Sequence, residues 1–367
     1  MLQKLSLTNF KNYNTLEVEF SPKINCITGD NGEGKTNILD AIYYLSFCKS
    51  FFSSTDALTV KHNENFFIIQ GEYQINGEPE LIYCGFESGK RKRFKRNKKE
   101  YDRMSDHIGL LPLVMASPHD TSLIIGGSDE RRKFIDGIIC QFDHDYLYHY
   151  QSYQRVLAQR NHMLREASNY SPVDNDMLQI YDEQLAYSGT IIYEKRKTFI
   201  ASFEPFFQKY FSTISQNKEQ VALNYISSLD DANLLQTLTA NHAVDIATRY
   251  TNFGVHKDDL ELKMGEQLIR KTGSQGQQKT YLIALKLAQF EYIRQQCQTM
   301  PILLLDDIFD KLDDKRVNQI VRIVAQNNFG QIFITDTSRE RISNILQQIE
   351  QPHRHFHLSN NNLAVIE

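Results

Sequence analysis

The chain has 367 residues, which is long for one compact core and long enough for two lobes. Its formal net charge is -4, so the surface as a whole does not attract polyanions and any nucleic-acid surface must be local. The five cysteines are scattered without a C-x-x-C pair, which argues for a reducing compartment and against a disulfide framework or zinc site. No apolar leader and no run of about 18 apolar residues is present, so we expect a cytoplasmic protein with no membrane partner.

The first quarter of the chain is patterned as short strands. Alternating apolar residues over 1–28 predict three strands, and the glycine-rich loop at 29–34 passes into the helical spacing of N-I-L-D-A-I-Y-Y-L. Residues 66–101 return to short strands, and we expect a meander there. The turn signals between these strands are Asn76-Gly77, Ser88-Gly89 and Asn97-Lys98.

The middle of the chain is helical. Residues 129–215 are rich in Gln, Tyr, Glu, Arg and Leu at helical spacing, and the only break that we expect is at 168–175. A helical arm is therefore inserted between two strand-bearing halves. Because the arm has no sustained heptad pattern, it does not form a long coiled coil.

The last third of the chain returns to strands and helices. A hairpin is predicted at 260–270, followed by a helix that includes A-L-K-L-A-Q-F-E-Y-I. Two short apolar runs, P-I-L-L-L-D-D at 301–307 and Q-I-F-I-T-D at 331–336, end in polar residues. Such runs are typical of strands buried in a parallel sheet, whose functional residues lie at their carboxyl ends.

Residues 29–36 read G-D-N-G-E-G-K-T and match the phosphate-binding pattern G-x-x-x-x-G-K-[ST]. The outer glycines let backbone N–H groups turn toward phosphate oxygens, the lysine adds a charge for the β- and γ-phosphates, and the threonine offers a hydroxyl to Mg²⁺. A chance glycine-rich turn is the alternative, but this loop has the required strand before it and helix after it. The residues predicted to bind the nucleotide are Gly29, Asp30, Asn31, Gly32, Glu33, Gly34, Lys35 and Thr36.

The strand L-L-L-D-D supplies the acidic partner of this loop. P-loop proteins hold the Mg²⁺ shell with a carboxylate at the end of a strand, a role that fits Asp306, and Asp307 would then face the attacking water as base or positioner. A helix cap or a solvated acidic turn is the alternative. Because the strand is apolar and lies downstream of a P-loop, we predict Thr36 and Asp306 as metal-binding residues and Lys35 and Asp307 as catalytic ones.

A second candidate anion-binding motif, S-Q-G-Q-Q-K at 274–279, precedes a clear helical pattern. A serine and a glycine at a helix N-terminus make an anion site from backbone N–H groups and the helix dipole. Since the chain already has one phosphate cradle, this second site is useful if it closes over the γ-phosphate held by another copy of the chain. An ordinary N-cap by Ser274 is the alternative. The residues predicted to reach the nucleotide are Ser274, Gly276 and Gln277.

Taken in order, these motifs resemble the ABC-type ATPase heads of SMC-like proteins and, more narrowly, the RecF family of bacterial recombination mediators. The resemblance covers nearly the whole chain. It is carried by the P-loop and by L-T-N-F-K-N-Y, S-P-H-D, G-G-S-D-E-R-R-K-F-I-D, Q-R-N, G-V-H-K-D-D-L, G-S-Q-G-Q-Q-K-T and L-L-L-D-D-I-F-D-K-L-D. It implies an α/β fold, an ABC-type P-loop ATPase head with a mixed-sheet lobe and an inserted all-helical lobe. Residues 1–118 and 295–367 would form the ATPase lobe, and residues 119–294 the mainly helical lobe with the signature motif.

The resemblance also implies a function. Members of the family bind ATP with Mg²⁺ and dimerise head to tail, so that two ATP molecules lie at the interface. The dimer binds duplex DNA with a preference for single-strand/duplex junctions. It acts in DNA replication and recombinational gap repair, where it works with RecR and RecO to help RecA load. Weak, DNA-stimulated ATP hydrolysis releases the dimer from DNA.

A few positions depart from the related sequences or lack a role. Asp307 stands where transporter heads have Glu, and its shorter arm fits slow turnover. Asp336 stands where they have His, which leaves the γ-phosphate sensor unassigned. Lys11 stands where the family usually has Arg, so a bidentate contact would become a point contact. The resemblance implies Asp313 at the dimer interface, whereas the H-K-D-D at 256–259 matches the family with no physical role assigned.

The one strongly basic run, at 90–99, is expected on a hairpin and could follow the phosphates of DNA. A solvated, lysine-rich edge strand is an equally weighted alternative. Phe94 alone gives too little aromatic interleaving for base stacking, so we expect sequence-independent contacts to the DNA backbone. The candidate DNA-binding residues are Lys90, Arg91, Lys92, Arg93, Lys95, Arg96, Lys98 and Lys99. A second candidate surface of less weight consists of Arg131, Arg132 and Lys133.

Two other functions stay open at this point. A metabolic kinase could use the same P-loop, but it would leave S-Q-G-Q-Q unexplained. A non-enzymatic DNA scaffold would bind ATP and hardly turn it over. A transporter motor is disfavoured because no membrane-coupling segment is visible, and the length of the insertion excludes a long-arm SMC protein.

Overall fold

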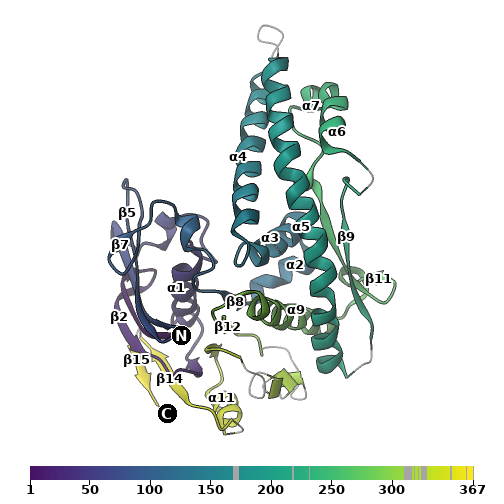
Figure 1. Ribbon diagram of the computed structural model, residues 1–367. Helices are drawn as coiled ribbons and strands as arrows, with labels where there is room; N and C mark the ends of the chain where they lie inside the picture. Colours follow the sequence, from purple (N-terminus) through teal and green to yellow (C-terminus); the bar gives the residue numbers. More distant parts are fainter. Residues whose placement is uncertain are drawn as a thin grey trace. The chain divides into compact units, whose positions relative to one another are not determined.

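A computed structural model of the protein has two compact units (Figure 1). The first comprises Met1–Asp120, Thr213–Gln216 and Lys279–Glu367, and the second comprises Thr121–Ser212 and Asn217–Gln278. This division differs from the predicted boundary at 294/295, since it assigns Lys279 onward to the first unit. The structure describes residues 1–167, 173–216, 219–230, 232–309, 316–317, 319–320, 322–323, 329–347, 349–360 and 362–366. Within these residues, no helix combines the length and the apolar character that a membrane crossing needs.

The first unit contains an antiparallel sheet in the order β2-β1-β4-β5-β6-β7. Its strands alternate between buried and more exposed residues because one face packs on the core. Both Asn76 and Gly77 have positive φ angles, of 51° and 87°, and so do Asn97 and Lys98, of 50° and 70°. These angles suit two-residue hairpin turns, and the predicted meander is confirmed. The strands are β1 (Leu2–Phe10), β2 (Tyr13–Glu19), β4 (Phe66–Ile75), β5 (Glu78–Glu87), β6 (Arg93–Arg96) and β7 (Lys99–Glu100).

The second sheet of this unit has the order β15-β14-β3-β13-β12-β8. Neighbouring strands from β14 to β8 run parallel, and β15 is antiparallel to β14. The three central strands are buried at every position, as their apolar runs predicted. The carboxyl ends of the parallel strands therefore meet at one edge of the sheet. The strands are β3 (Ile24–Thr28), β8 (Leu113–Ala116), β12 (Ile302–Asp306), β13 (Ile332–Asp336), β14 (His353–Ser359) and β15 (Asn362–Val365).

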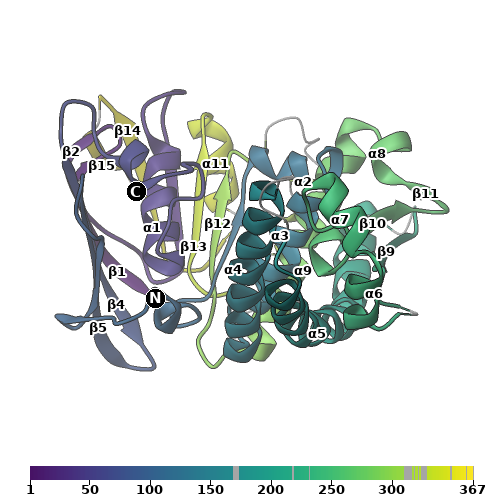
Figure 2. The same ribbon diagram turned by 90° about the horizontal axis from the view of Figure 1, so that it is seen from above.

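Helix α1 (Lys35–Phe47) lies between the two sheets of the first unit (Figure 2). Its buried residues Ile38 and Ile42 belong to one hydrophobic cluster with Leu5 of β1 and Phe333 of β13. This packing holds the N-terminus of α1, which follows the glycine-rich loop, against the parallel sheet. Other helical segments of this unit with described bounds are η1 (Asp56–Thr59), η2 (Met104–His107), η3 (Pro118–Asp120), α11 (Arg339–Leu346) and most of α9 (Gln275–Gln296).

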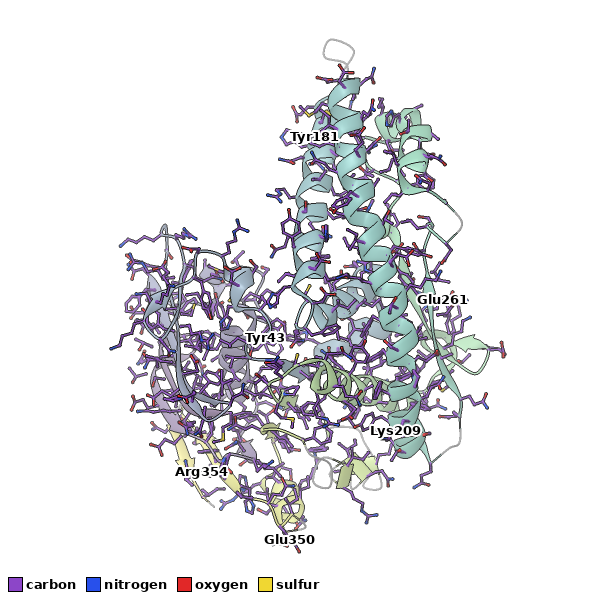
Figure 3. The ribbon with its side chains drawn as sticks, in the orientation of Figure 1. Tyr43, Tyr181, Lys209, Glu261, Glu350 and Arg354 are labelled. Atoms are coloured by element: carbon purple, nitrogen blue, oxygen red, sulfur yellow. The ribbon has the colours of Figure 1, made fainter. Side chains whose placement is uncertain are left out.

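The second unit is built on two long helices, α4 and α5, which run side by side (Figure 1). Tyr181 of α5 lies near one end of this helical pair (Figure 3). The sequence predicted a single break in the helical region, but a further break at 140–143 separates α3 from α4. Asp143 causes it by capping α4, since its carboxylate accepts a hydrogen bond from Tyr146 N at 2.8 Å. The helices are α2 (Thr121–Ile125), α3 (Ser128–Ile139), α4 (His144–Glu166), α5 (Asn175–Ser215), α6 (Leu234–Ala240), α7 (His242–Thr248), η4 (Val255–Lys257) and α8 (Ile269–Thr272).

A three-stranded antiparallel sheet, in the order β11-β10-β9, also belongs to the second unit. The lobe that was expected to be all-helical is therefore mainly helical. The hairpin predicted at 260–270 corresponds to β10 and β11, with Gly265 at its turn and a φ of 60°. Strand β9 was not predicted because V-A-L-N-Y-I is too short for a clear alternation. The strands are β9 (Val221–Ile226), β10 (Asp259–Met264) and β11 (Gln267–Leu268).

Two buried arginines join the helices of the second unit. Arg196 of α5 donates to both carboxylate oxygens of Asp136 on α3, at 2.9 and 3.0 Å, and to Asp258 at 3.0 Å. Arg160 of α4 pairs with Asp182 of α5 at 2.7 Å. Because each guanidinium meets carboxylates inside the unit, the charges are compensated where water cannot reach them.

The H-K-D-D segment acquires a structural role from this network. His256 lies between the hydroxyl of Tyr153, at 2.8 Å, and the backbone O of Thr251, at 2.9 Å. Burial lowers the pKa of His256 to about 4, so the imidazole is neutral near pH 7. Asp258 is a partner of the buried arginine of α5, and Asp259 pairs with an arginine of α3. The segment therefore links the helices of the second unit to β10.

Candidate nucleotide-binding site

The glycine-rich loop joins β3 to α1, and close neighbours set its shape. A Cβ atom at Gly29 would lie 2.4 Å from the backbone O of Leu358 on β14, and one at Gly34 would lie 2.4 Å from the side chain of Asn12. Gly34 also has a φ of 107°, in the region that favours glycine. Glycine is therefore required at both ends of the predicted phosphate-binding loop.

Lys35 is the first residue of α1, and its ammonium group lies within the loop. The side chain is buried, and Nζ donates hydrogen bonds to the backbone O of Gly29 at 2.7 Å and of Asp30 at 3.0 Å. The loop thus holds a positive charge beside the N-terminus of a 13-residue helix. The lysine ammonium, the helix dipole and the backbone N–H groups of a glycine-rich loop together suit the phosphates of a nucleotide.

The turn between β1 and β2 supports the loop from outside. The Asn12 side chain donates to the backbone O of Glu33 at 3.0 Å and accepts from Asn37 at 2.7 Å. The hydroxyl of Tyr13 donates to the backbone O of Gly34 at 3.0 Å. Sequence reasoning missed both supporting residues, although the L-T-N-F-K-N-Y motif contains them. The same turn places Lys11, whose Nζ lies 2.6 Å from a carboxylate oxygen of Asp40 on α1.

Asp306, at the carboxyl end of β12, meets two hydroxyl groups. The Thr36 hydroxyl lies 2.9 and 3.1 Å from its two carboxylate oxygens, and the Thr335 hydroxyl donates to Oδ1 at 2.7 Å. Burial raises the pKa of Asp306, while the hydrogen bonds from the two threonines act in the opposite direction. A carboxylate next to a hydroxyl is a set of hard oxygen ligands, so Thr36 and Asp306 fit a Mg²⁺ ion.

Asp307 follows directly and has a φ of 46°, which is uncommon for a residue other than glycine. Its backbone N–H donates to the hydroxyl of Thr335 at 3.0 Å. The structure thus brings Asp307 next to the two predicted metal-binding residues, at the edge of the sheet where the glycine-rich loop also lies. Its catalytic role stays a prediction.

Asp336, at the end of β13, is engaged within its own segment. Its carboxylate accepts hydrogen bonds from Ser338 N at 2.7 Å and from the Arg341 guanidinium at 3.0 Å, and the side chain is buried. These contacts stabilise the start of α11 and explain an aspartate at this position. They give no basis for a γ-phosphate sensor, which stays unassigned.

The signature motif forms the N-terminus of α9. Ser274 N donates to Oε1 of Gln277 at 2.7 Å, and Gln277 N donates back to the Ser274 hydroxyl at 3.3 Å. This reciprocal pair is a capping box, so the N-cap alternative for Ser274 is confirmed as the local structure. The Gln277 amide also donates to the carboxylate of Glu219. Ser274 is exposed, and Gly276 and Gln277 are half-buried; their contact with a nucleotide stays a prediction.

Comparisons with known proteins agree with these motifs. A protein named DNA replication and repair protein RecF, from Bacteroides thetaiotaomicron, is 51% identical over 357 residues, which are 97% of this chain and 96% of that protein. The chain belongs to the RecF family. The model of the RecF/RecN/SMC N terminal domain matches residues 1–101 of this family member.

Solved structures extend the likeness to the whole fold of RecF. The recombination mediator protein RecF-ATP in the RecFOR pathway has a TM-score of 0.89 and 27% identity, covering 100% of this chain and 97% of that chain. An Smc head domain from Pyrococcus furiosus has a TM-score of 0.58 and 17% identity, covering 100% and 95%. The predicted fold class, an ABC- and SMC-type ATPase head, is therefore confirmed. Asp313, implied at the RecF dimer interface, lies outside the described residues.

The basic run at 90–99 covers the residues before β6, β6 itself and the turn into β7, and part of it is engaged in internal contacts. Lys92 contacts Asp56 at 2.8 Å and the Tyr44 hydroxyl at 2.9 Å, so its ammonium group holds η1 and α1 against the sheet. Arg96 forms a bidentate pair with Glu80, at 2.5 and 2.8 Å. The set of candidate DNA-binding residues is therefore reduced to the exposed members of the run. The residues of the run that are exposed are Lys90, Arg91, Arg93, Lys98 and Lys99.

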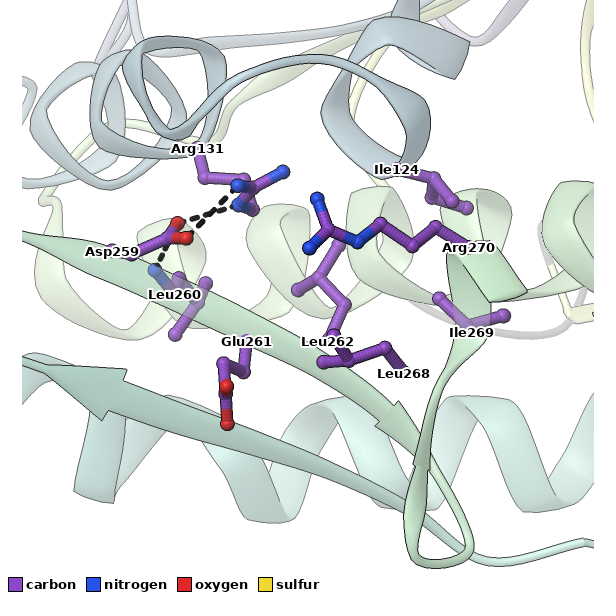
Figure 4. Close-up of a pocket in the computed structure, with 9 residues that line it drawn as sticks. All are labelled: Ile124, Arg131, Asp259, Leu260, Glu261, Leu262, Leu268, Ile269 and Arg270. Atoms are coloured by element: carbon purple, nitrogen blue, oxygen red, sulfur yellow. Dashed lines mark hydrogen bonds and ion pairs between the residues drawn. The ribbon is translucent and has the colours of Figure 1, made fainter. Parts of the chain in front are cut away.

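The second candidate DNA surface is wrong at its first residue. Arg131 is buried and donates to both carboxylate oxygens of Asp259, at 2.7 and 3.0 Å (Figure 4). Arg132 donates to the backbone O of Asp258 at 2.6 Å, and Lys133 pairs with Glu130 at 2.7 Å. Arg131 thus joins α3 to β10, and Arg132 joins α3 to the residue before β10, whereas Lys133 pairs within α3.

Proposed function

We propose that this RecF-family chain binds ATP with Mg²⁺ and acts on DNA in replication and recombinational gap repair. The observation that carries the proposal is the meeting of Lys35, Thr36 and Asp306 at one edge of the parallel sheet. A lysine, a hydroxyl and a strand-end carboxylate are the side chains that P-loop proteins use for MgATP. The relative's name, DNA replication and repair protein, and the solved RecF-ATP structure support the same chemistry.

The residues of the site would divide the chemistry among them. Backbone N–H groups of residues 29–34 and the ammonium of Lys35 stabilise the phosphates, and Thr36 and Asp306 hold Mg²⁺. Mg²⁺ held by these two residues would supply positive charge that neutralises the phosphate oxygens. Asp307 orients the attacking water and takes up its proton. Because an aspartate arm is one methylene shorter than that of a glutamate, we propose a weak ATPase. Stimulation of this ATPase by DNA is part of the proposal and rests on the resemblance to the RecF family.

A second copy of the chain would complete the site. Ser274 caps a 22-residue helix, and Gly276 and Gln277 lie in its first turn, where backbone N–H groups favour an anion. In a head-to-tail dimer these residues reach the γ-phosphate bound by the partner's residues 29–36. ATP then joins the two copies, and its hydrolysis separates them. This arrangement explains why one chain has both a phosphate-binding loop and a distant signature motif.

The DNA contacts would be made to the backbone and depend on salt. The exposed part of the basic run includes Arg93 on β6, Lys98 at the β6–β7 turn and Lys99 on β7, and it supplies charge without aromatic side chains for stacking. We propose duplex DNA and single-strand/duplex junctions as the bound forms. RecR and RecO are the expected partners in helping RecA to load, and the expected compartment is the cytoplasm.

A binding titration and a turnover measurement test the proposal. Binding of a fluorescent ATP analogue in the presence of Mg²⁺ is expected for the wild-type chain and lost in Lys35→Ala, while an exposed lysine of the second unit, Lys209→Ala, serves as the control. Phosphate release measured with and without duplex DNA separates a weak ATPase from a scaffold with no turnover. Phosphate transfer to a small acceptor by the monomer would support the kinase alternative instead.

A further inference from the structure

We infer that Thr335 is a positioning residue, whose hydroxyl fixes the backbone of Asp307 to the carboxylate of Asp306. The inference deepens the proposed ATPase function and rests on it for its consequence in catalysis. The contact itself lies within one copy of the chain and needs neither nucleotide nor a second copy. It joins the residue predicted to hold the metal ion to the residue predicted to orient the attacking water.

The position of Thr335 follows from the sheet. Strands β12 and β13 are parallel neighbours, and Asp306 is the register partner of Thr335. Side chains of register partners lie on the same face of a sheet, so the hydroxyl and the carboxylate must meet. Thr335 is fully buried and Asp306 nearly so. The contact is therefore shielded from water.

The direction of each hydrogen bond is determined. The backbone N–H of Asp307 can only donate, and it does so to the Thr335 hydroxyl at 3.0 Å. The single hydroxyl proton is then available for Oδ1 of Asp306, at 2.7 Å. One side chain therefore accepts from the first residue and donates to the second. Valine has the same shape and can do neither, whereas serine retains both bonds.

Asp307 needs such a support because of its backbone. Its φ of 46° lies in the left-handed region, which residues with a Cβ atom adopt rarely. The bond from its N–H to Thr335 holds that conformation and so directs the side chain. Thr36, the other hydroxyl partner of Asp306, lies on α1 instead of the sheet. The support from Thr335 is thus independent of the glycine-rich loop.

The first test uses the chain without nucleotide. Amide hydrogen exchange of Asp307, followed by NMR, is expected to be about tenfold faster in Thr335→Val, because the N–H loses its acceptor, and close to wild type in Thr335→Ser. Thr335→Ala replaces the valine variant if that variant does not fold. Unchanged exchange in the variants without a hydroxyl overturns the inference, and so does equal acceleration in Thr335→Ser, which would assign the effect to the lost methyl group.

The second test uses ATP turnover. Thr335→Val is expected to lower kcat about tenfold with little change in KM, and Thr335→Ser to recover most of kcat. A larger change in KM than in kcat, or a wild-type kcat in Thr335→Val, contradicts a positioning role. If the wild-type chain itself does not hydrolyse ATP, the proposed ATPase fails, while the exchange experiment still decides whether Thr335 positions Asp307.

Discussion

The hydroxyl of Thr36 lies 2.9 Å from a carboxylate oxygen of Asp306, although 270 residues separate the two in the chain. The contact forms because β3 and β12 flank β13 in one parallel sheet, so their carboxyl ends open on the same edge. The glycine-rich loop leaves the first of these strands and the D-D pair ends the second. The fold thereby brings together, from opposite ends of the sequence, the two residues predicted to bind the metal ion.

Thr36→Val should weaken Mg²⁺-dependent ATP binding about tenfold, because the side chain keeps its shape and loses one oxygen ligand. Binding in the presence of EDTA should change little. Thr190→Val is the matched control, since Thr190 is an exposed threonine of α5 whose hydroxyl bonds only within the helix among the described contacts. Isothermal titration of the three proteins measures the effect. Equal losses with and without Mg²⁺ would argue against a metal-binding role for Thr36.

Asp307→Asn should lower ATP hydrolysis about a hundredfold and leave ATP binding intact, because an amide cannot take up the proton of the attacking water. Asp336→Asn provides the comparison within the same sheet. Its carboxylate holds Ser338 and Arg341, so the variant should lower the unfolding temperature and retain most of its turnover. Phosphate release and thermal unfolding of both variants check the assignment, which the reverse pattern would refute.

Substitutions in the basic run at 90–99 should affect DNA affinity where the side chain is exposed, and fold stability where it is paired inside the protein. Lys98→Glu is expected to weaken duplex binding and to reduce the salt dependence of the affinity, because Lys98 is exposed at the β6–β7 turn. Lys92→Met should instead lower the stability of the fold, since it removes the partner of Asp56. Lys209→Glu, on α5, controls for net charge. DNA titrations at several salt concentrations decide, and an unchanged affinity and salt slope in Lys98→Glu would remove this surface from consideration.

Arg196→Met should destabilise the second unit by about 3–5 kcal/mol, because it leaves the carboxylates of Asp136 and Asp258 buried without their cation. Arg165→Met, at the exposed end of α4, should change stability by less than about 0.5 kcal/mol. Urea unfolding of the two variants measures the difference. Similar unfolding midpoints for both would show that the buried network contributes little.

Acid should destabilise both units through two histidines. Burial lowers the pKa of His107 and of His256 from 6.5 to about 4, so the unfolded chain takes up protons between these values before the folded chain does. The contribution of the two neutral histidines to the free energy of unfolding is therefore largest above pH 6.5 and falls as the pH drops toward 4. Between pH 6.5 and 5 each histidine should contribute a loss of about 1.5 kcal/mol. Thermal unfolding at these two pH values checks the sign, and a higher unfolding temperature at pH 5 would contradict it.

Local patterns predicted much of this molecule. The strand before the glycine-rich loop, the helix after it, the hairpin turn at Asn97-Lys98 and the buried strand that ends at Asp306 all follow from residues close together in the chain. The support of the loop by Asn12 and the pairing of Lys92 with Asp56 could not be predicted that way, because such contacts depend on tertiary packing. The capping of α4 by Asp143 could have been predicted, since an aspartate before a helical run is a local start signal.

Strand β14 was missed for a different reason. Its sequence, H-R-H-F-H-L-S, is rich in histidine and does not read as an apolar run, yet it pairs in parallel with β3. The hydroxyl of Thr28 lies 3.0 Å from Nε2 of His355, and such contacts satisfy polar side chains inside the sheet. Only the folded neighbours show why these residues tolerate burial.

The mass of the Asp307→Asn chain in saturating MgATP tests the central claim, that ATP is shared between the loop at residues 29–36 of one copy and the Ser274 motif of another. Light scattering should give twice the monomer mass with MgATP and the monomer mass with ADP or without nucleotide. Adding Ser274→Arg to the same chain should restore the monomer, with ATP binding retained. A monomer mass for Asp307→Asn at saturating ATP would contradict the shared site.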